Sequence, residues 1–274
     1  MTGRSGAPSV PLAEIVTYLD EFLEIRDVPD APTALNGLQV ENTGRIGSLV
    51  AAVDASQATI DGVIEEELES GTSDGGAPLL LVHHGLFWEG NVPVTGRRYR
   101  RLSALLEHDI ALYSAHLPLD LHPVVGNNAV LAERLGIAVE GWFGETRGRP
   151  IGVWGQIPAG LAHRDALRAE LGRAVGATAP GPMLIAGGPE RIARVGIITG
   201  GAGSAIAAAR DAGLDTFITG EGPHHTYFDA MEWGLNVFYA GHYATETLGV
   251  QALASHLSDR FELPWAFHDH PTGL

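Results

Sequence analysis

The sequence predicts an α/β fold, and two observations carry that prediction. Short apolar runs alternate with amphipathic stretches of helical period along most of the chain, as strands and covering helices do. Polar residues suited to chemistry directly follow several of the apolar runs. Because sites in open α/β sheets form beyond the carboxyl ends of the strands, we expect a candidate site there.

The first part of the chain contains apolar runs that predict buried strands at 48–53, 79–82 and 110–114. The run SLVAAV, for example, is apolar almost throughout and ends at Asp54. Gly136 supplies a stop signal for the helix before it, as a C-cap glycine does. The expected helices occupy residues 11–23, 57–70, 101–108 and 127–135, and a Gly-rich loop is expected at 71–77.

The middle of the chain changes character between residues 140 and 192. The segment GETRGRPIGVWG at 144–155 is rich in Gly and Arg and predicts a turn with an edge strand. A helix at 161–175 and a loop at 177–188 follow. We therefore expect a main α/β domain formed by residues 1–139 and 193–274, which carries the candidate ligands described below, and a smaller central subdomain at 140–192.

Strand and helix patterns resume after residue 193. Apolar runs predict strands at 195–199, 216–219 and 237–240, and helices are expected at 204–212, through Trp233, and from GHYATE to about residue 257. The segment GGAGSA at 200–205 opens one of these helices. Its backbone N–H groups could hold an anion, and a plain tight connection is the alternative.

Composition excludes several classes of chemistry. The chain has 274 residues, 12 His and no Cys, and all 17 basic residues are Arg. Without Cys there is no disulfide, thiolate nucleophile, iron–sulfur cluster or Cys-type zinc site. Without Lys there is no Walker-type phosphate lysine and no Schiff base. Any bound metal must therefore be held by imidazole and carboxylate.

The charge balance makes a nucleic acid an unlikely partner. The formal charge is −16, which opposes binding of a long phosphate backbone, and the one dense basic run, Arg97 to Arg101, is expected to be a solvated helix start. No run approaches the roughly 18 apolar residues needed to cross a bilayer. We expect a cytoplasmic protein without a membrane segment.

Three short segments carry residues that could bind metal ions. His83 and His84 directly follow a strand, and neighbouring side chains on an extended chain point to opposite sides, so the pair suits two different ions. Asp120 in YSAHLPLD offers a carboxylate, which can bridge two cations. His242 and Glu246 in GHYATE share one helix face. Each segment alone also fits a structural role as a hydrogen-bonded His, a turn cap or an exposed helix face.

Together these segments offer three imidazoles and two carboxylates. Such a set suits two divalent ions such as Zn²⁺, Fe²⁺ or Mn²⁺, with positions left for water, which is typical of catalytic sites. The roles of Glu221, His224 and His225 stay open. His268 and His270 lie near the C-terminus, where a weak metal contact and disorder are both open readings.

Seven stretches of the chain resemble the family called GTP cyclohydrolase 1 type 2 homologues, or Nif-three-like proteins. They are NGLQV (36–40), LLLVHHG (79–85), YSAHLPLD (113–120), GNNAVLAERLG (126–136), TGGAGSA (199–205), TGE (219–221) and AGHYATE (240–246). The resemblance implies two interleaved α/β domains, a dinuclear metal site at the carboxyl ends of strands and a homohexameric ring with the sites facing an inner cavity. Many members have Pro where this chain has Gly85, and the long central insertion of larger members is absent.

The resemblance also implies a role for each candidate ligand. His83 and His84 would bind different ions. Asp120 would join the ion held by His84, and His242 would join the ion held by His83. Glu246 would bridge the two ions.

The predicted function is that of a metal-dependent hydrolase acting on a small molecule, although the residues leave open whether the protein is an enzyme. His116 is the candidate proton shuttle because it lies near Asp120 in sequence and is not counted as a ligand. A hydrogen-bonding role is the alternative for His116. The alternative function is a non-enzymatic, oligomeric metal-binding or scaffold protein. The GTP cyclohydrolase activity in the family name does not follow from these residues.

Overall fold

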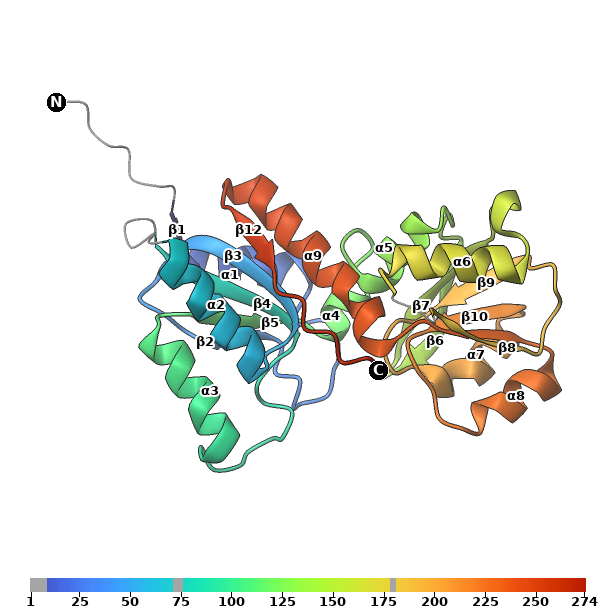
Figure 1. Ribbon diagram of the computed structural model, residues 1–274, viewed down its shortest axis with the longest axis horizontal. Coiled ribbons are helices and arrows are strands. Elements are labelled where there is room, and N and C mark those ends of the chain that lie inside the picture. The colour runs from blue at the N-terminus through green and yellow to red at the C-terminus, as the bar shows by residue number, and fades with distance from the viewer. Residues whose placement is uncertain (1–8, 71–75, 178–180) are drawn as a thin grey trace. The chain divides into compact units, whose positions relative to one another are not determined.

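The computed structural model describes residues 9–70, 76–177 and 181–274. Most of the expected loop at 71–77 and residues 178–180 of the loop at 177–188 lie outside the described residues. The chain forms two interleaved compact units: Met1–Leu119 with Val250–His270, and Asp120–Gly249 with Pro271–Leu274 (Figure 1). We call these unit 1 and unit 2. Each has its own sheet with helices packed against it, so the α/β class is confirmed.

Unit 1 is built around a six-stranded sheet with the path β1-β3-β4-β5-β2, and β12 pairs with β3 beside this path. Strands β3, β4 and β5 are parallel, whereas β2 runs antiparallel to β5. Its elements are β1 (Val10–Pro11), α1 (Leu12–Phe22), β2 (Gly37–Val40), β3 (Arg45–Asp54), α2 (Gln57–Ser70), β4 (Ala77–His84), α3 (Gly96–Glu107), β5 (Ala111–Ser114) and β12 (Trp265–Phe267). Two helices cross the boundary between the units in sequence: α4 (Leu117–Asp120) and α9 (His242–Phe261).

Unit 2 is built around a second six-stranded sheet in the order β6-β7-β9-β10-β11-β8. Its parallel centre consists of β9, β10 and β11, while β7 and β8 pair antiparallel to it. Its elements are α5 (Asn127–Arg134), β6 (Gly141–Thr146), β7 (Arg149–Gln156), the 3₁₀ turn η1 (Ala159–Leu161), α6 (Arg164–Ala174), β8 (Met183–Ala186), β9 (Arg194–Ile197), η2 (Gly203–Ala205), α7 (Ile206–Asp211), β10 (Thr216–Thr219), α8 (Thr226–Trp233) and β11 (Asn236–Tyr239).

Residues 140–192, expected as a smaller subdomain, contribute β6, β7 and β8 to this same sheet. The main boundaries between the compact units lie after Leu119 and after Gly249, whereas boundaries after residues 139 and 192 were expected. The turn and edge strand expected at 144–155 form a β6–β7 hairpin. Its two-residue loop, Arg147–Gly148, has positive φ at both positions (52° and 83°), as the hairpin turns that match the twist of the strands require.

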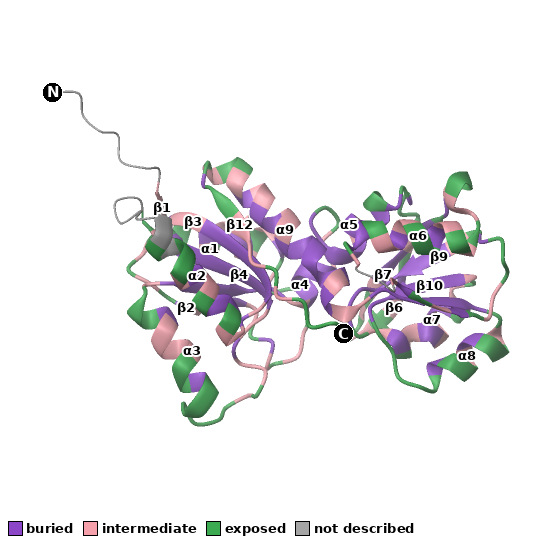
Figure 2. Cartoon of the chain, in the orientation of Figure 1, coloured by how far each residue is buried: buried purple, intermediate pink, exposed green. Residues whose placement is uncertain are grey.

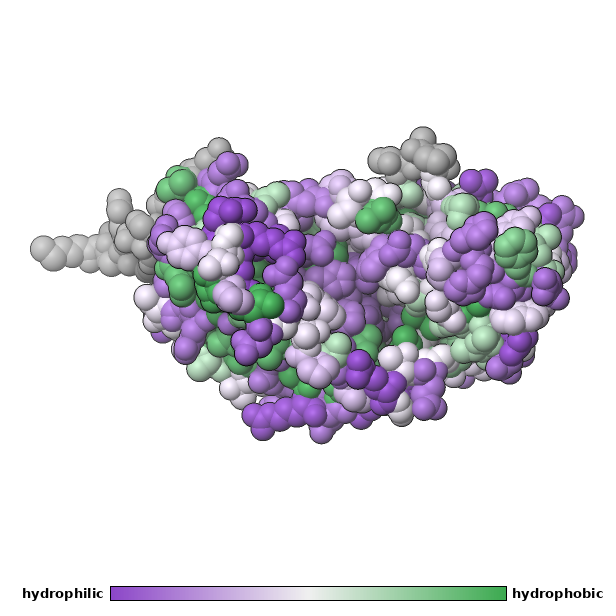
Figure 3. All heavy atoms as spheres, turned by 90° about the horizontal axis from the view of Figure 1, so that it is seen from below, coloured by the Kyte–Doolittle hydropathy of each residue, from purple (hydrophilic) through white to green (hydrophobic). Residues whose placement is uncertain are grey.

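Burial follows the sheets in both units. The strands are mainly buried, and the helices expose their outer faces (Figure 2). The face drawn in Figure 3 is largely hydrophilic with scattered hydrophobic side chains. Tyr227, Phe228 and Met231 of α8 are among the exposed apolar residues of the described chain. In the described part of the chain, no helix is both long and apolar enough to cross a membrane.

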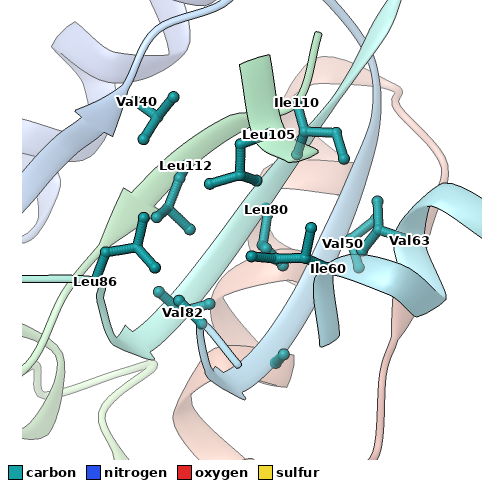
Figure 4. Packing of buried hydrophobic residues seen from close by; sticks show 12 residues of the cluster. Val40, Val50, Ile60, Val63, Leu80, Val82, Leu86, Leu105, Ile110 and Leu112 are labelled. Carbon is teal, nitrogen blue, oxygen red and sulfur yellow. The ribbon is translucent and has the colours of Figure 1, made fainter. Parts of the chain in front are cut away.

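The core of unit 1 on one side of its sheet shows why the apolar runs become strands. Alternate residues Val50 and Ala52 of β3, Leu80 and Val82 of β4, and Leu112 of β5 pack against α2 and α3 (Figure 4). Ile60 of α2 and Leu105 of α3 are fully buried in the same cluster. The packed part of β4 leads directly into His83 and His84, which are the last two residues of the strand.

Helix α3 begins at Gly96 and therefore five residues before the expected start at residue 101. The expectation of a solvated arginine run is wrong at Arg98, which is only 6% exposed. Its guanidinium donates hydrogen bonds to the carbonyls of Gly90 (2.9 Å) and Val92 (3.0 Å) and lies over the ring of Phe87. Arg98 thus ties the loop after β4 to the first turn of α3.

Candidate metal centre

The His83–His84 pair lies at the carboxyl end of β4, as expected. His83 is fully buried, and its Nδ1 lies 2.9 Å from the carbonyl oxygen of Ala115. Because a carbonyl only accepts, Nδ1 carries the proton and Nε2 is the nitrogen suited to a metal. His84 has the same arrangement, with Nδ1 donating to Asp54 Oδ1 at 2.9 Å, and Asp54 pairs with His84 in the β3–β4 register.

His116 joins this pair in unit 1. Its ring centroid lies 5.0 Å from that of His83 and 5.6 Å from that of His84. One ligand nitrogen from each of the three rings lies within 4.8 Å of the others. We call these three residues the imidazole group. Although neighbouring strand residues leave the chain on opposite sides, the rings of His83 and His84 lie 4.7 Å apart.

The buried carboxylate of Asp30 binds the Nδ1 side of the His116 ring. The two oxygens of Asp30 lie 3.0 and 3.1 Å from His116 Nδ1. Burial alone would raise the pKa of Asp30, but the hydrogen bond and the charge of His116, with hydrogen bonds from Asn36 and Ala31, lower that pKa to about 2. Sequence reasoning missed Asp30 because it lies in a loop without hydrophobic periodicity.

The loop after β4 closes one side of the imidazole group. The ring of Trp88 stands edge-on to His116 and His84, with centroid distances of 4.9 and 5.8 Å. Gly85 lies against the amide of Gln39, and a Cβ at Gly85 would come within 2.3 Å of it. Gln39 Oε1 also accepts the N–H of Leu86 at 2.8 Å. A glycine therefore suits this position.

Unit 2 brings together the two residues of GHYATE. His242 Nε2 lies 3.2 Å from Glu246 Oε1, and His242 Nδ1 lies 2.8 Å from Glu221 Oε1. Glu246 is almost completely buried. The hydrogen bond to Glu246 raises the pKa of His242, burial opposes it, and Glu221 adds to the rise, giving a pKa of about 9. The open role of Glu221 is thus that of a partner for His242.

Asp120 is also buried in unit 2, at the end of α4. Its Oδ1 accepts a hydrogen bond from Asn127 Nδ2 at 2.8 Å, and Asn127 Oδ1 accepts the N–H of Gly249 at 2.6 Å. These contacts hold the carboxylate in place.

Glycine turns at the carboxyl ends of β9, β10 and β11 let the backbone approach His242 and Glu246. A Cβ on Gly200, whose φ is +69°, would lie 2.1 Å from Glu246 Oε1. Two N–H groups of the segment 200–205, where an anion cradle and a plain tight connection were both considered, have acceptors within the protein. Gly200 N–H donates to Thr245 Oγ1 and Gly203 N–H to the carbonyl of Glu221, both at 3.0 Å.

The other histidines singled out in the sequence have contacts of their own within each unit. His225 precedes α8, and the ring of His224 packs against Phe228. In unit 1, His268 Nε2 lies 2.7 Å from Glu66 Oε2, and its ring stacks on that of His270. These contacts order the C-terminal histidines within unit 1, so the alternative of disorder does not apply to them.

The donor chemistry fits a divalent ion. Each of His83, His84 and His242 directs Nδ1 to an oxygen acceptor, so a metal ion would be bound through Nε2. His116 has the same orientation, with Nδ1 on Asp30. Metal-binding histidines are typically oriented in this way by a carboxylate or carbonyl on the other nitrogen. Imidazole and carboxylate together suit Zn²⁺, Fe²⁺ or Mn²⁺.

Comparisons with known proteins agree with the fold and with the motifs. Residues 10–272 match the family model described as Duf34/NIF3 (NGG1p interacting factor 3). A protein of Deinococcus radiodurans named GTP cyclohydrolase 1 type 2 homolog is 41% identical over 274 residues, which cover 100% of this chain and 98% of that protein. The solved structure of protein ybgI, described as of unknown function, has a TM-score of 0.83 and 37% identity over 97% of this chain and 100% of that one. TTHA1606 from Thermus thermophilus has a TM-score of 0.82 and 40% identity over 97% of this chain and 100% of that one.

Proposed function

Because the chain belongs to the Duf34/NIF3 family, we propose that it is a metal-dependent hydrolase that holds two divalent ions per chain. The proposed ligands are three imidazoles and two carboxylates: His83, His84, Asp120, His242 and Glu246. The observation that carries the proposal is the shared orientation of the histidines, each with Nδ1 on an oxygen acceptor. In this proposal His83 and His84 would hold different ions, and Glu246 would supply a carboxylate to both.

The chemistry divides between the ions and the chain. Bound divalent ions lower the pKa of coordinated water and polarise the bond under attack. His83, His84 and His242 would offer their Nε2 atoms to the ions, and Asp120 and Glu246 would supply negative charge. His242, whose pKa is about 9 beside Glu246, would have to lose its Nε2 proton on binding an ion. His116 takes a proton at Nε2 and returns it to the leaving group, while Asp30 holds the proton on Nδ1. The curated relatives' name makes GTP the first substrate to test.

Metal content measured on purified protein tests the ligand assignment. We expect about two ions per chain in the wild type, as in two-metal hydrolases. The variants His83→Ala and Glu246→Ala should each lose metal and lose turnover of GTP or of a substrate found in a hydrolase panel. Glu232→Ala, an exposed change on α8, is the matched control. If Glu246→Ala kept both ions and full activity, the assignment would be wrong.

The second candidate is a non-enzymatic metal-binding protein, in which the same imidazole and carboxylate groups hold ions without turning over a substrate. Turnover that follows metal occupancy would exclude this candidate, and metal binding without turnover on any substrate would favour it.

We also propose a homohexamer in the cytoplasm, on the strength of the family resemblance. Light scattering coupled to size-exclusion chromatography tests the assembly, since the chain mass is 28.9 kDa. A monomeric mass would contradict it.

A further inference from the structure

The Asp30 carboxylate is surrounded by hydrogen-bond donors. It accepts the main-chain N–H of Ala31 (2.6 Å) and of Leu117 (3.0 Å) and the side-chain N–H of Asn36 (2.9 Å). Its two oxygens also face His116 Nδ1 at 3.0 and 3.1 Å. The Asp30 side chain is only 6% exposed, so water cannot readily replace these partners.

These contacts determine where the proton of His116 lies. The other three partners of the Asp30 carboxylate are all N–H donors, which favour its ionised form, and an ionised carboxylate can only accept hydrogen bonds. His116 Nδ1 must therefore be the donor. In the neutral ring, Nε2 then carries a lone pair rather than a proton.

We propose that Asp30 is a positioning residue that fixes His116 in the Nδ1–H tautomer and turns its Nε2 toward His83 and His84. The inference deepens the proposed function, because it explains how His116 could accept a proton at Nε2. It concerns a tautomer and a ring orientation, so it can be tested without any substrate.

Contacts to the main chain and to the ring restrain His116 further. The backbone N–H of His116 donates to Asn36 Oδ1 at 2.8 Å, and the next amide, of Leu117, donates to Asp30. Trp88 stands edge-on to the ring at 4.9 Å with an interplanar angle of 85°. Asp30 and Asn36 therefore hold the main chain and the side chain of His116 together, which leaves the ring little freedom to rotate.

The restraint is stronger at His116 than at His84. His84 also donates Nδ1–H to a carboxylate, but Asp54 is 39% exposed, against 6% for Asp30. Water can compete for Asp54 and offer His84 other partners. We therefore expect Asp30 to restrict the tautomer of His116 more strongly than Asp54 restricts that of His84.

Long-range ¹H–¹⁵N NMR of the metal-free, full-length protein tests the inference. Histidine ring nitrogens with and without a proton have well separated ¹⁵N shifts, and the His116→Gln variant identifies the His116 signals. The spectrum is taken at a pH where the His116 ring is neutral. We expect a protonated Nδ1 and an unprotonated Nε2. A proton on Nε2 in the wild type would overturn the proposal.

The Asp30→Asn variant tests the cause of the tautomer, with Asp27→Asn as control because Asp27 is an exposed carboxylate of the same segment. The Asn side chain can donate to His116 Nδ1, so the neutral ring should shift toward the Nε2–H form. Asp27→Asn should leave the signals unchanged. An unchanged tautomer in folded Asp30→Asn would overturn the positioning role, and if that variant fails to fold, the wild-type spectrum still decides. Absence of turnover on any substrate would count against the proposed function but not against this tautomer.

Discussion

Glu221 accepts the Nδ1–H of His242 at 2.8 Å, so a carboxylate outside the proposed ligand set orients a ligand inside it. Glu221 follows β10 and His242 opens α9 after β11, and these two strands are parallel neighbours. The carboxyl ends of neighbouring parallel strands meet at one edge of a sheet, which is why residues 21 positions apart come into contact.

The Glu221→Gln variant should therefore weaken metal binding without removing a ligand. Losing a carboxylate partner of a ligating histidine typically costs about 10–100-fold in metal affinity. Competition between the protein and a chromophoric chelator for Zn²⁺ measures the change. Glu232→Gln, an exposed change in the same unit, should bind Zn²⁺ like the wild type. Equal affinities for all three proteins would show that Glu221 does not act through His242.

Asp30 should make folding stability depend on acid pH. Its pKa is lowered to about 2 from the ordinary value of 3.8, so its ionised form stabilises the folded state. This contribution is fully present above about pH 4 and is lost as the pH falls through 2, and the shift corresponds to about 2 kcal/mol. Urea unfolding of the wild type and of Asp30→Asn between pH 2 and 5 measures it. Parallel pH profiles for the two proteins would contradict the prediction.

A methyl group at Gly200 should disturb Glu246. Gly200→Ala places a Cβ 2.1 Å from Glu246 Oε1 and also strains a backbone with φ of +69°. Gly148→Ala is the matched control, because its φ is +83° but its Cβ would meet no atom within 4 Å. Positive φ costs an alanine roughly 1–2 kcal/mol at either position. We expect an additional loss of unfolding free energy, and weaker Zn²⁺ binding, only for Gly200→Ala. Equal losses in both variants would mean that the backbone conformation alone matters.

Removing the Arg98 guanidinium should loosen the loop that carries Trp88. The Arg98→Met variant keeps a long apolar stem but loses the hydrogen bonds to the carbonyls of Gly90 and Val92. A hydrogen bond from a charged donor is worth roughly 1.5–3 kcal/mol, so amide hydrogen exchange over residues 85–95 should become faster. Arg100→Met, at an exposed position on the same helix, should leave this exchange unchanged. Slow exchange in Arg98→Met would show that other contacts hold the loop.

The sequence predicted the parts of the fold that depend on local pattern. Apolar runs located β3, β4 and β5, and Gly136, with a φ of +66°, ends the region of α5 as a C-cap glycine should. The place of the imidazole pair at the end of β4 followed from the same pattern, because the apolar run leads directly into His83 and His84. The family itself was also predicted, and the comparisons confirm it.

The rest depended on contacts between residues distant in sequence. Strand partners are such contacts: nothing in the pattern of 149–156 indicates that β7 pairs with β9. Asp30 and His116 are 86 positions apart, and the loop of Asp30 has no periodic signal. Arg98 was predicted to be solvated like its neighbours, because the sequence does not indicate which backbone carbonyls will accept its hydrogen bonds.

The interleaving of the two units has a consequence for synthesis on the ribosome. The main segment of unit 2 is one continuous stretch, Asp120–Gly249, whereas β3 in unit 1 pairs with β12, at Trp265–Phe267. A nascent chain can therefore complete the sheet of unit 2 before β12 has left the ribosome, and until then β3 lacks this pairing partner. Exposed strand edges favour association between chains, so misfolding would begin in this interval. A chain that is released before residue 265 would keep the edge of β3 exposed.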